Sequence, residues 1–220
     1  TSANNYIALL ESPEEIRRAA LRFARSGQNL GQIRISGPLN LSRSEGRLKL
    51  DILSLDRQIL NLLGASRGWD FAETKIEGAS VIDLLQKGSG IAAAGKITGR
   101  NLGIRSDTGS TPPLDLDLDY QVSANRSEKT GVLHKFNLLI KQNQSDVVRA
   151  GLDRPMNLSW GGNQPGVRSS TLRTTITNLD LAEWKPVLGN VAPTGKAAMT
   201  LDLLVEQDGR MLQGGLKAQL

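Results

Sequence analysis

The chain lacks cysteine, has a single histidine and is poor in aromatic residues. The absence of cysteine excludes disulfide bonds, thiolate metal sites and a cysteine nucleophile. One histidine cannot form the histidine cluster that many metal sites use. Aromatic residues make up only 4% of the chain, which is too few for the stacking platforms of single-stranded nucleic-acid binders. We therefore expect no nucleic-acid partner.

Long hydrophobic runs and a strong charge bias are also lacking. No run approaches the roughly 20 apolar residues of a membrane-spanning helix, and the N-terminal stretch TSANNYIALLESPEE has no signal-peptide pattern. Lys and Arg outnumber Asp and Glu by 27 to 22, and the excess is scattered along the chain. The chain begins and ends abruptly, with Leu220 closing an alternating run, so we expect a piece of a longer protein.

What the sequence does contain is alternation of apolar and polar residues, interrupted by turn sequences such as SRSEG, KGSG and NRSEKTG. About nine or ten strands are predicted, and they should be antiparallel because the crossover helices of parallel strands are missing. Runs such as 28–41 and 74–86 exceed the usual strand of about 5–6 residues. This pattern predicts a mainly β fold with one long curved antiparallel sheet. We expect a single β-groove segment over 1–220, with strand arrays at about 28–53 and 69–178 and a closing hairpin at about 195–220.

Three helices are expected. In SPEEIRRAALRFARSG, Ser12 can cap the N-terminus, Pro13 suits the first helical position and Glu15 completes a capping box. Two shorter helices are predicted at about 55–63 and 180–188, each followed by glycine. The longest helix, at 12–26, would be amphipathic, with an apolar face of Ile16, Ala19, Ala20, Phe23 and Ala24 and a basic side of Arg17, Arg18, Arg22 and Arg25.

The acidic run PPLDLDLDYQV resembles a calcium-binding loop only in its spacing. Such a loop needs Gly at its sixth position and Glu at its twelfth, where this chain has Tyr120 and Arg126. In an extended strand, side chains two residues apart lie about 6.5–7 Å from one another, so three cannot reach one ion. Asp115, Asp117 and Asp119 are therefore predicted to face water and not a metal.

Two other motifs suggest chemistry but lack its context. GASRG, with Ser66 at its centre and His134 as the one available base, has a helix before it where a nucleophile elbow has a strand. GIAAAGK is followed by Ile97 where a phosphate-binding loop needs Ser or Thr. We therefore expect no catalytic, metal or cofactor site, and a protein that is not an enzyme.

The apolar side of the strands is the stronger candidate for function. A row of leucine and isoleucine side chains along a curved sheet either lines a groove for a lipid or packs into the protein's own core. The candidate groove-lining residues are Ile33, Ile35, Leu48, Leu50, Ile52, Leu114, Leu116, Leu118, Tyr120, Leu138, Ile140, Leu201, Leu203, Val205, Leu212 and Leu216.

The segment 172–220 resembles the AsmA-like family of bacterial envelope proteins, the relatives of TamB. It combines an NLDL step at 178–181, a short helix, a P-x-G-x-x-x-x-x-L-x-L strand at 193–203 and a G-x-x-L-x-G-x-L-type return. The stretch 31–65 is similar in style, again with a short helix that closes a repeat.

This resemblance implies long curved antiparallel sheets with an apolar inner groove, in a periplasmic protein whose parent is anchored in the inner membrane. It also implies a role in outer-membrane biogenesis, with phospholipid or another acyl lipid as the cargo and envelope assembly proteins as further partners. Membrane contact would then come from parts of the parent outside this chain. The alternative is a structural or assembly scaffold whose apolar face is closed by its own helices or by a partner protein.

Overall fold

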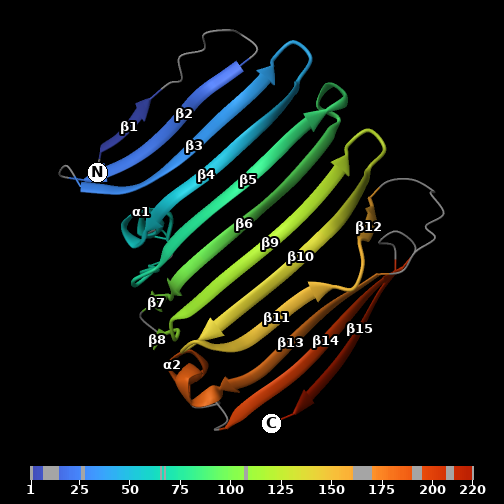
Figure 1. Ribbon diagram of the computed structural model, residues 1–220. Coiled ribbons are helices and arrows are strands. Elements are labelled where there is room, and N and C mark those ends of the chain that lie inside the picture. The colour runs from blue at the N-terminus through green and yellow to red at the C-terminus, as the bar shows by residue number, and fades with distance from the viewer. Residues whose placement is uncertain are drawn as a thin grey trace.

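A computed structural model describes residues 2–6, 15–25, 28–64, 66, 68–106, 109–160, 170–189, 195–206 and 211–219. The strands form one open antiparallel sheet of thirteen strands (Figure 1). Neighbours in the sheet are also neighbours in the chain, except where β7 and β8 come between β6 and β9 and around β12. Among the described helices, none has the length and apolar character needed to span a bilayer.

The sheet is a meander. Its path runs through β1 (Ser2–Tyr6), β2 (Glu15–Arg25), β3 (Gln28–Asn40), β4 (Glu45–Asp56), β5 (Lys75–Leu85), β6 (Gly90–Leu102), β9 (Leu114–Asn125), β10 (Thr130–Gln142), β11 (Ser145–Leu152), β13 (Ser170–Asp180), β14 (Lys196–Glu206) and β15 (Met211–Gln219). The short strand β12 (Met156–Ser159) pairs with β10, and β7 (Arg105–Ser106) and β8 (Gly109–Ser110) form a separate hairpin. The predicted fold class, mainly β with one long antiparallel sheet, is confirmed.

The predicted helix at 12–26 is wrong. Residues 15–25 form β2, which pairs with β1 on one side and with β3 on the other. The segment also alternates, with Ala19, Leu21 and Phe23 two residues apart, so its sequence fits either period. The open edge of β3 decides between them, because a strand satisfies the backbone groups of that edge and a helix cannot. Ser12 and Pro13 lie outside the described residues.

The strand count also differs from the predicted nine or ten. The predicted helix contributes a strand, β1 lies beside it, and the region after β10 breaks into the short strands β11 and β12. The short helix α1 (Arg57–Gly64) lies where one was expected. The second expected short helix is a 3-10 turn, η3 (Leu181–Trp184), that leads into the four-residue α2 (Lys185–Leu188). The predicted closing hairpin is β14 with β15, and its Asp208-Gly209 turn lies outside the described residues.

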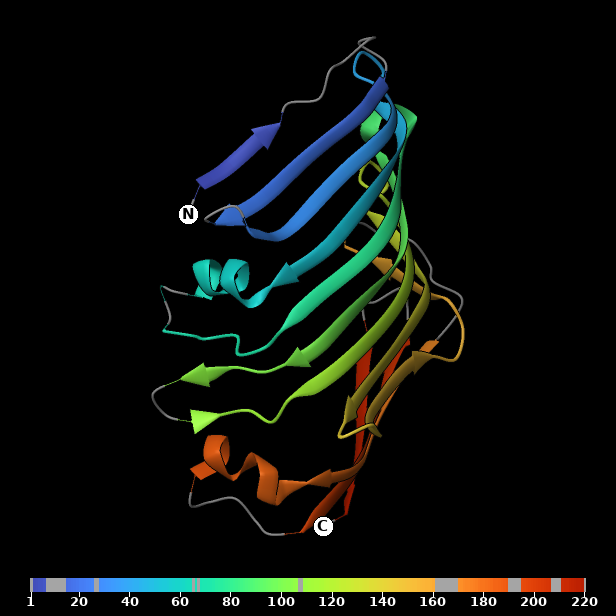
Figure 2. The same cartoon turned by 60° about the vertical axis from the view of Figure 1, so that its left-hand side comes forward.

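The two ends of the strands are built differently. At one end, which we call the loop end, lie α1, the β7–β8 hairpin and η3–α2; at the other, the turn end, short turns join β3 to β4, β5 to β6 and β9 to β10 (Figure 1). Register shifts occur near the loop end of β4, β6 and β13, for instance between Gly99 and Leu102. Such bulges bend a strand and increase its twist. Figure 2 shows the strands curving away from the plane of the sheet toward the loop end.

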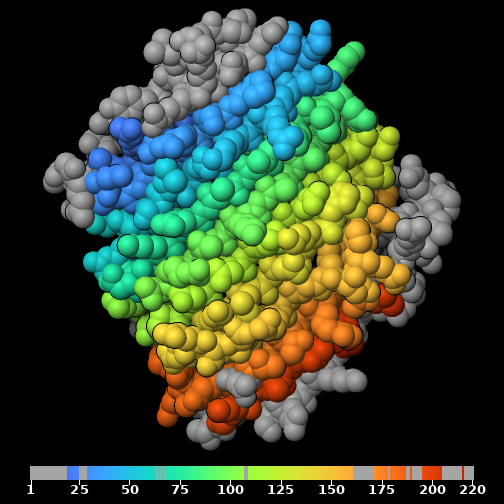
Figure 3. Space-filling view, in the orientation of Figure 1, coloured from blue at the N-terminus to red at the C-terminus, as the bar shows by residue number. Residues whose placement is uncertain are grey.

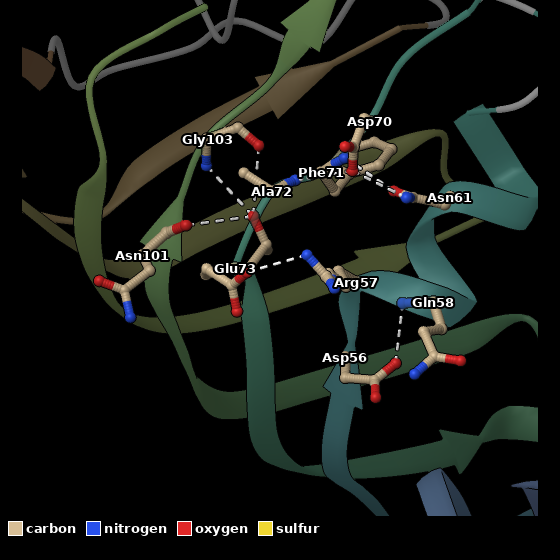
Figure 4. A network of polar contacts seen from close by, with 11 residues as sticks. Asp56, Arg57, Gln58, Asn61, Asp70, Phe71, Ala72, Glu73, Asn101 and Gly103 are labelled. Carbon is tan, nitrogen blue, oxygen red and sulfur yellow. Dashed lines mark hydrogen bonds and ion pairs between the residues drawn. The ribbon is translucent and has the colours of Figure 1, made fainter.

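A polar network holds the loop end together (Figure 4). Asn61 of α1 donates from Nδ2 to Asp70 Oδ1 at 2.8 Å and accepts from the Phe71 amide at 2.7 Å. Thr74, only 2% exposed, donates from its hydroxyl toward the Asn101 and Gly103 carbonyls and accepts from the Gly103 amide. These bonds join α1 to the start of β5 and the end of β6, so the helix is fixed to strands that come after it in the chain.

The described residues include only a small conventional core. The buried apolar side chains are Leu30, Ile59, Leu60, Val147, Ala150, Met156 and Leu181. The accessible surface is 13906 Å², whereas a compact monomer of 23.7 kDa would expose about 9,800 Å². The excess follows from the single-layer form, in which most side chains on both faces are half-buried by their lateral neighbours. Figure 3 shows one broad face as diagonal bands of side chains, one band per strand.

Candidate functional site: the apolar face of the sheet

The strand register gathers the apolar side chains on one face. One continuous series of directly paired residues crosses the sheet from β2 to β15. Five of its members, Ile33, Ile52, Ile97, Leu118 and Leu138, are part-exposed. The series is Leu21, Ile33, Ile52, Gly78, Ile97, Leu118, Leu138, Ala150, Thr174, Leu201 and Leu216. We call this face of the sheet the apolar face.

The other candidate residues fall on the same face. One flanking row runs through Ala19, Ile35, Leu50, Ser80, Gly95, Tyr120 and Phe136, and another through Leu55, Ile76, Gly99, Leu116, Ile140, Val148, Ile176, Met199 and Ala218. Leu48 pairs with Ile82, and Leu114 with Leu102. Leu203 pairs with Leu172, and Val205 with Leu212. The register thus places the sixteen predicted positions on one face of the sheet, with Val205, Leu212 and Leu216 placed by backbone register alone.

A polar pair interrupts the middle of the apolar face. Tyr120 lies opposite Gly95, which lies opposite Ser80, and the Tyr120 and Ser80 hydroxyls are 2.9 Å apart. Because Gly95 has no side chain, the phenol can extend across β6 to reach the serine. The pair satisfies the Ser80 hydroxyl, which belongs to a residue only 8% exposed, without placing a charge among the leucines.

The opposite face carries the charged residues. Asp119 lies 2.6 Å from Lys135 Nζ and 3.7 Å from Lys96 Nζ, Asp117 pairs with Arg100, and Asp202 pairs with Arg173. The hydrogen bond from Lys135 is the largest of the effects that lower the pKa of Asp119 below its usual value. The hydrogen bond to Asp202 likewise raises the pKa of Arg173. We call this the charged face.

The carboxylates of PPLDLDLDYQV each have a separate partner on or beside this face. Asp115 accepts from the Asn101 amide at 3.0 Å, whereas Asp117 and Asp119 bind different cationic side chains. Among the described residues, no group of three or more metal-binding side chains is brought together.

A hollow of about 990 Å³ lies on the charged face, between β6 and β13. The side chains that the strand alternation directs toward it include those of Lys96, Asp119, Leu139 and Arg173. Lys96 and Asp119 form an ion pair within the lining. Arg149 and Arg173 instead bind Asp146 and Asp202 beside the hollow. The hollow was not expected from the sequence, because sheet curvature and not residue pattern creates it.

The remaining motifs are separated from the chemistry that they suggested. His134 lies at a register shift of β10, and its Nε2 is 2.8 Å from Ser123 Oγ, whereas Ser66 is exposed beyond the end of α1. The GIAAAGK segment is extended within β6. Arg17, Arg18, Arg22 and Arg25 belong to β2, so they do not form the basic side of a helix.

Sequence reasoning missed several members of the apolar face. Ile97, Phe136, Val148 and Met199 lie in its rows but were not among the candidates. The alternation is weakest in β5 and β6, where Gly78, Ser80, Gly95 and Gly99 occupy face positions. Ile97 could have been placed on the apolar face by aligning β6 with β9, because Ile97 lies opposite the predicted face residue Leu118.

No protein-family model, curated protein or solved structure significantly matches this chain.

Proposed function

We propose that this chain is a non-catalytic segment of a periplasm-spanning, AsmA-like envelope protein that handles phospholipid along its apolar face. The observation that carries the proposal is the largely apolar row of paired residues that crosses a single-layer sheet from β2 to β15. Acyl chains that lie on these side chains leave water together with them, and each buried methylene contributes about 0.8 kcal/mol.

The shape of the sheet supports a lipid over a self-contained core. The helices α1 and α2 lie at the loop end in both ribbon views, so they leave the middle of the strands uncovered (Figures 1 and 2). A contiguous apolar patch on a protein surface commonly marks a ligand or partner site, and most of the apolar side chains here are part-exposed from β2 to β14. The charged face keeps the other side of the same strands in water.

Binding of a soluble, fluorescently labelled phospholipid to delipidated protein tests the proposal. Leu118→Gln places an amide in the middle of the apolar face and should weaken binding about tenfold, since the contact of two or so methylene groups is lost. The matched control is Leu139→Gln, because Leu139 pairs with Asp117 and Arg149 on the charged face. Equal effects of the two substitutions would rule out the apolar face as the lipid site.

The scaffold alternative predicts a different result. If a partner protein closes the apolar face, purified protein should carry no phospholipid in native mass spectrometry and should not bind the labelled lipid. Co-purified phospholipid that is lost in Leu118→Gln but retained in Leu139→Gln would favour lipid handling.

A further inference from the structure

The turn end of the sheet carries a cluster of exposed apolar side chains. Leu41 and Trp160 are 59% and 56% exposed, and both lie where strands reach this end. Figure 1 shows the β3–β4, β5–β6 and β9–β10 turns and β12 along one rim of the sheet. The exposed large apolar residues there are Leu41, Leu85, Ile91, Leu158 and Trp160.

This rim is continuous with the apolar face. A row of paired residues runs along it through Leu39, Gly46, Leu84, Ile91, Ala124, Gly131 and Leu158. Trp160 donates its amide to the Lys129 carbonyl, and its indole lies over Gly131, where a side-chain carbon would be 3.2 Å from the ring. The indole therefore extends the apolar face to the edge of the molecule.

Cationic side chains surround the same rim. Arg43, Lys87, Arg126 and Lys129 are exposed in the turns, and none of them forms an ion pair with another described residue. The same turns contain fewer acidic residues than basic ones. Glu128 is exposed, and Glu45 accepts a hydrogen bond from the Lys87 amide at 3.1 Å.

We propose that the turn end docks on the surface of a lipid bilayer that contains anionic headgroups. Tryptophan and leucine side chains suit the boundary between headgroups and acyl chains, and exposed Lys and Arg are attracted to anionic lipid. The loop end has a different balance of charge. It also carries exposed Lys and Arg side chains, but acids offset them: Arg57 is paired with Glu73 at 2.8 Å, and Asp56, Asp70, Asp180 and Glu183 add negative charge.

Docking extends the proposed function but can be separated from it. The apolar face would bind individual acyl chains at positions such as Leu138, whereas the rim would bind the surface of an intact bilayer. If the Leu138→Gln variant binds vesicles normally but no longer binds labelled phospholipid monomers, docking is retained while acyl-chain binding is lost.

Vesicle co-sedimentation with the full chain tests the docking. The rim variant combines Arg43→Gln, Lys87→Gln, Arg126→Gln and Lys129→Gln. The matched control removes the same charge from the loop end, with Lys75→Gln, Arg105→Gln, Lys185→Gln and Lys196→Gln, all at exposed positions. On vesicles of phosphatidylcholine with phosphatidylglycerol, the rim variant should lose at least tenfold in partitioning, and the control should stay within about twofold. Wild-type binding should also weaken as salt is raised.

A second measurement reports on the contact itself. With Trp69→Phe and Trp184→Phe, Trp160 becomes the one tryptophan, and brominated phospholipid in the vesicles should quench its fluorescence. Unquenched Trp160, equal losses in the two charge variants, or no vesicle binding by wild type would each overturn the proposal. Self-association of the chain that Trp160→Ala abolishes, in the absence of vesicle binding, would assign the rim to protein contact instead.

Discussion

The hydroxyl groups of Tyr120 and Ser80 lie 2.9 Å apart although strand β6 separates their strands. The contact depends on Gly95, the residue that pairs with both of them in the register. A β-carbon added at Gly95 would lie 2.3 Å from Ser80 Oγ and 2.6 Å from the Ala79 carbonyl oxygen. The glycine therefore shapes the middle of the apolar face.

Gly95→Ala should destabilise the protein by about 1–3 kcal/mol, because the new methyl group cannot fit without moving the backbone of β5. Urea denaturation measures the change. The matched control is Gly215→Ala on β15, where a side-chain carbon would meet no atom within 4 Å. Equal stability of the two variants would contradict the close packing of β5 on β6.

The coupling between the two hydroxyls can be measured separately. Tyr120→Phe removes the phenol oxygen and leaves the Ser80 hydroxyl without this partner, so it should cost about 1 kcal/mol. In a double-mutant cycle, Ser80→Ala should cost less in the Tyr120→Phe background than in wild type. Additive effects would show that the hydrogen bond contributes nothing to stability.

The loop-end network makes Asn61 more important than its position on a short helix suggests. Asn61→Ala removes the bonds to Asp70 and to the Phe71 amide, and should lower the free energy of unfolding by about 1–3 kcal/mol. Leu62→Ala, at the neighbouring position that is 55% exposed, should change it by less than about 0.5 kcal/mol. Thermal unfolding followed by circular dichroism distinguishes the two, and similar losses would argue against the network.

Acid should weaken the fold partly through Asp70. The hydrogen bond from Asn61, with help from the Ala72 amide and nearby arginines, lowers the pKa of Asp70 below its usual value, although partial burial opposes the shift. A carboxyl with a lowered folded-state pKa stabilises the protein above its unfolded pKa, and this contribution is lost as the pH falls through the folded value.

Asp70→Asn should therefore reduce the difference in unfolding free energy between about pH 6 and about pH 3. Part of the difference should remain, since the pKa of Asp119 is lowered as well. Urea titrations at both pH values provide the measurement. A difference as large as that of wild type would mean that Asp70 has the same pKa in the folded and unfolded states.

Period-two alternation directly encodes which residues of a strand share a face, so the long antiparallel strands could be predicted from the residue pattern. Leu114, Leu116 and Leu118 alternate with aspartates, so in an extended strand the leucines share one face and the aspartates share the other. The short helix α1 was also predictable, since Asp56 caps it through the Gln58 amide and Gly64 follows its last apolar residue.

Other features depend on partners far away in the chain. The segment 15–25 fits two periods, and pairing with β3 selects the strand. The charged hollow and the group of exposed cations at the rim depend on curvature and on which turns lie side by side. Trp160 joins the apolar face through its position over Gly131, about 30 residues away in the chain.

Site-specific photocrosslinking at two adjacent residues of β10 tests the central claim most directly. Leu138 pairs with Leu118 on the apolar face, and Leu139 pairs with Asp117 on the charged face. A benzoylphenylalanine at position 138 should crosslink to bound phospholipid, whereas the same group at position 139 should not. Crosslinking at both positions, or at neither in the presence of saturating phospholipid, would contradict an acyl-chain site on the apolar face.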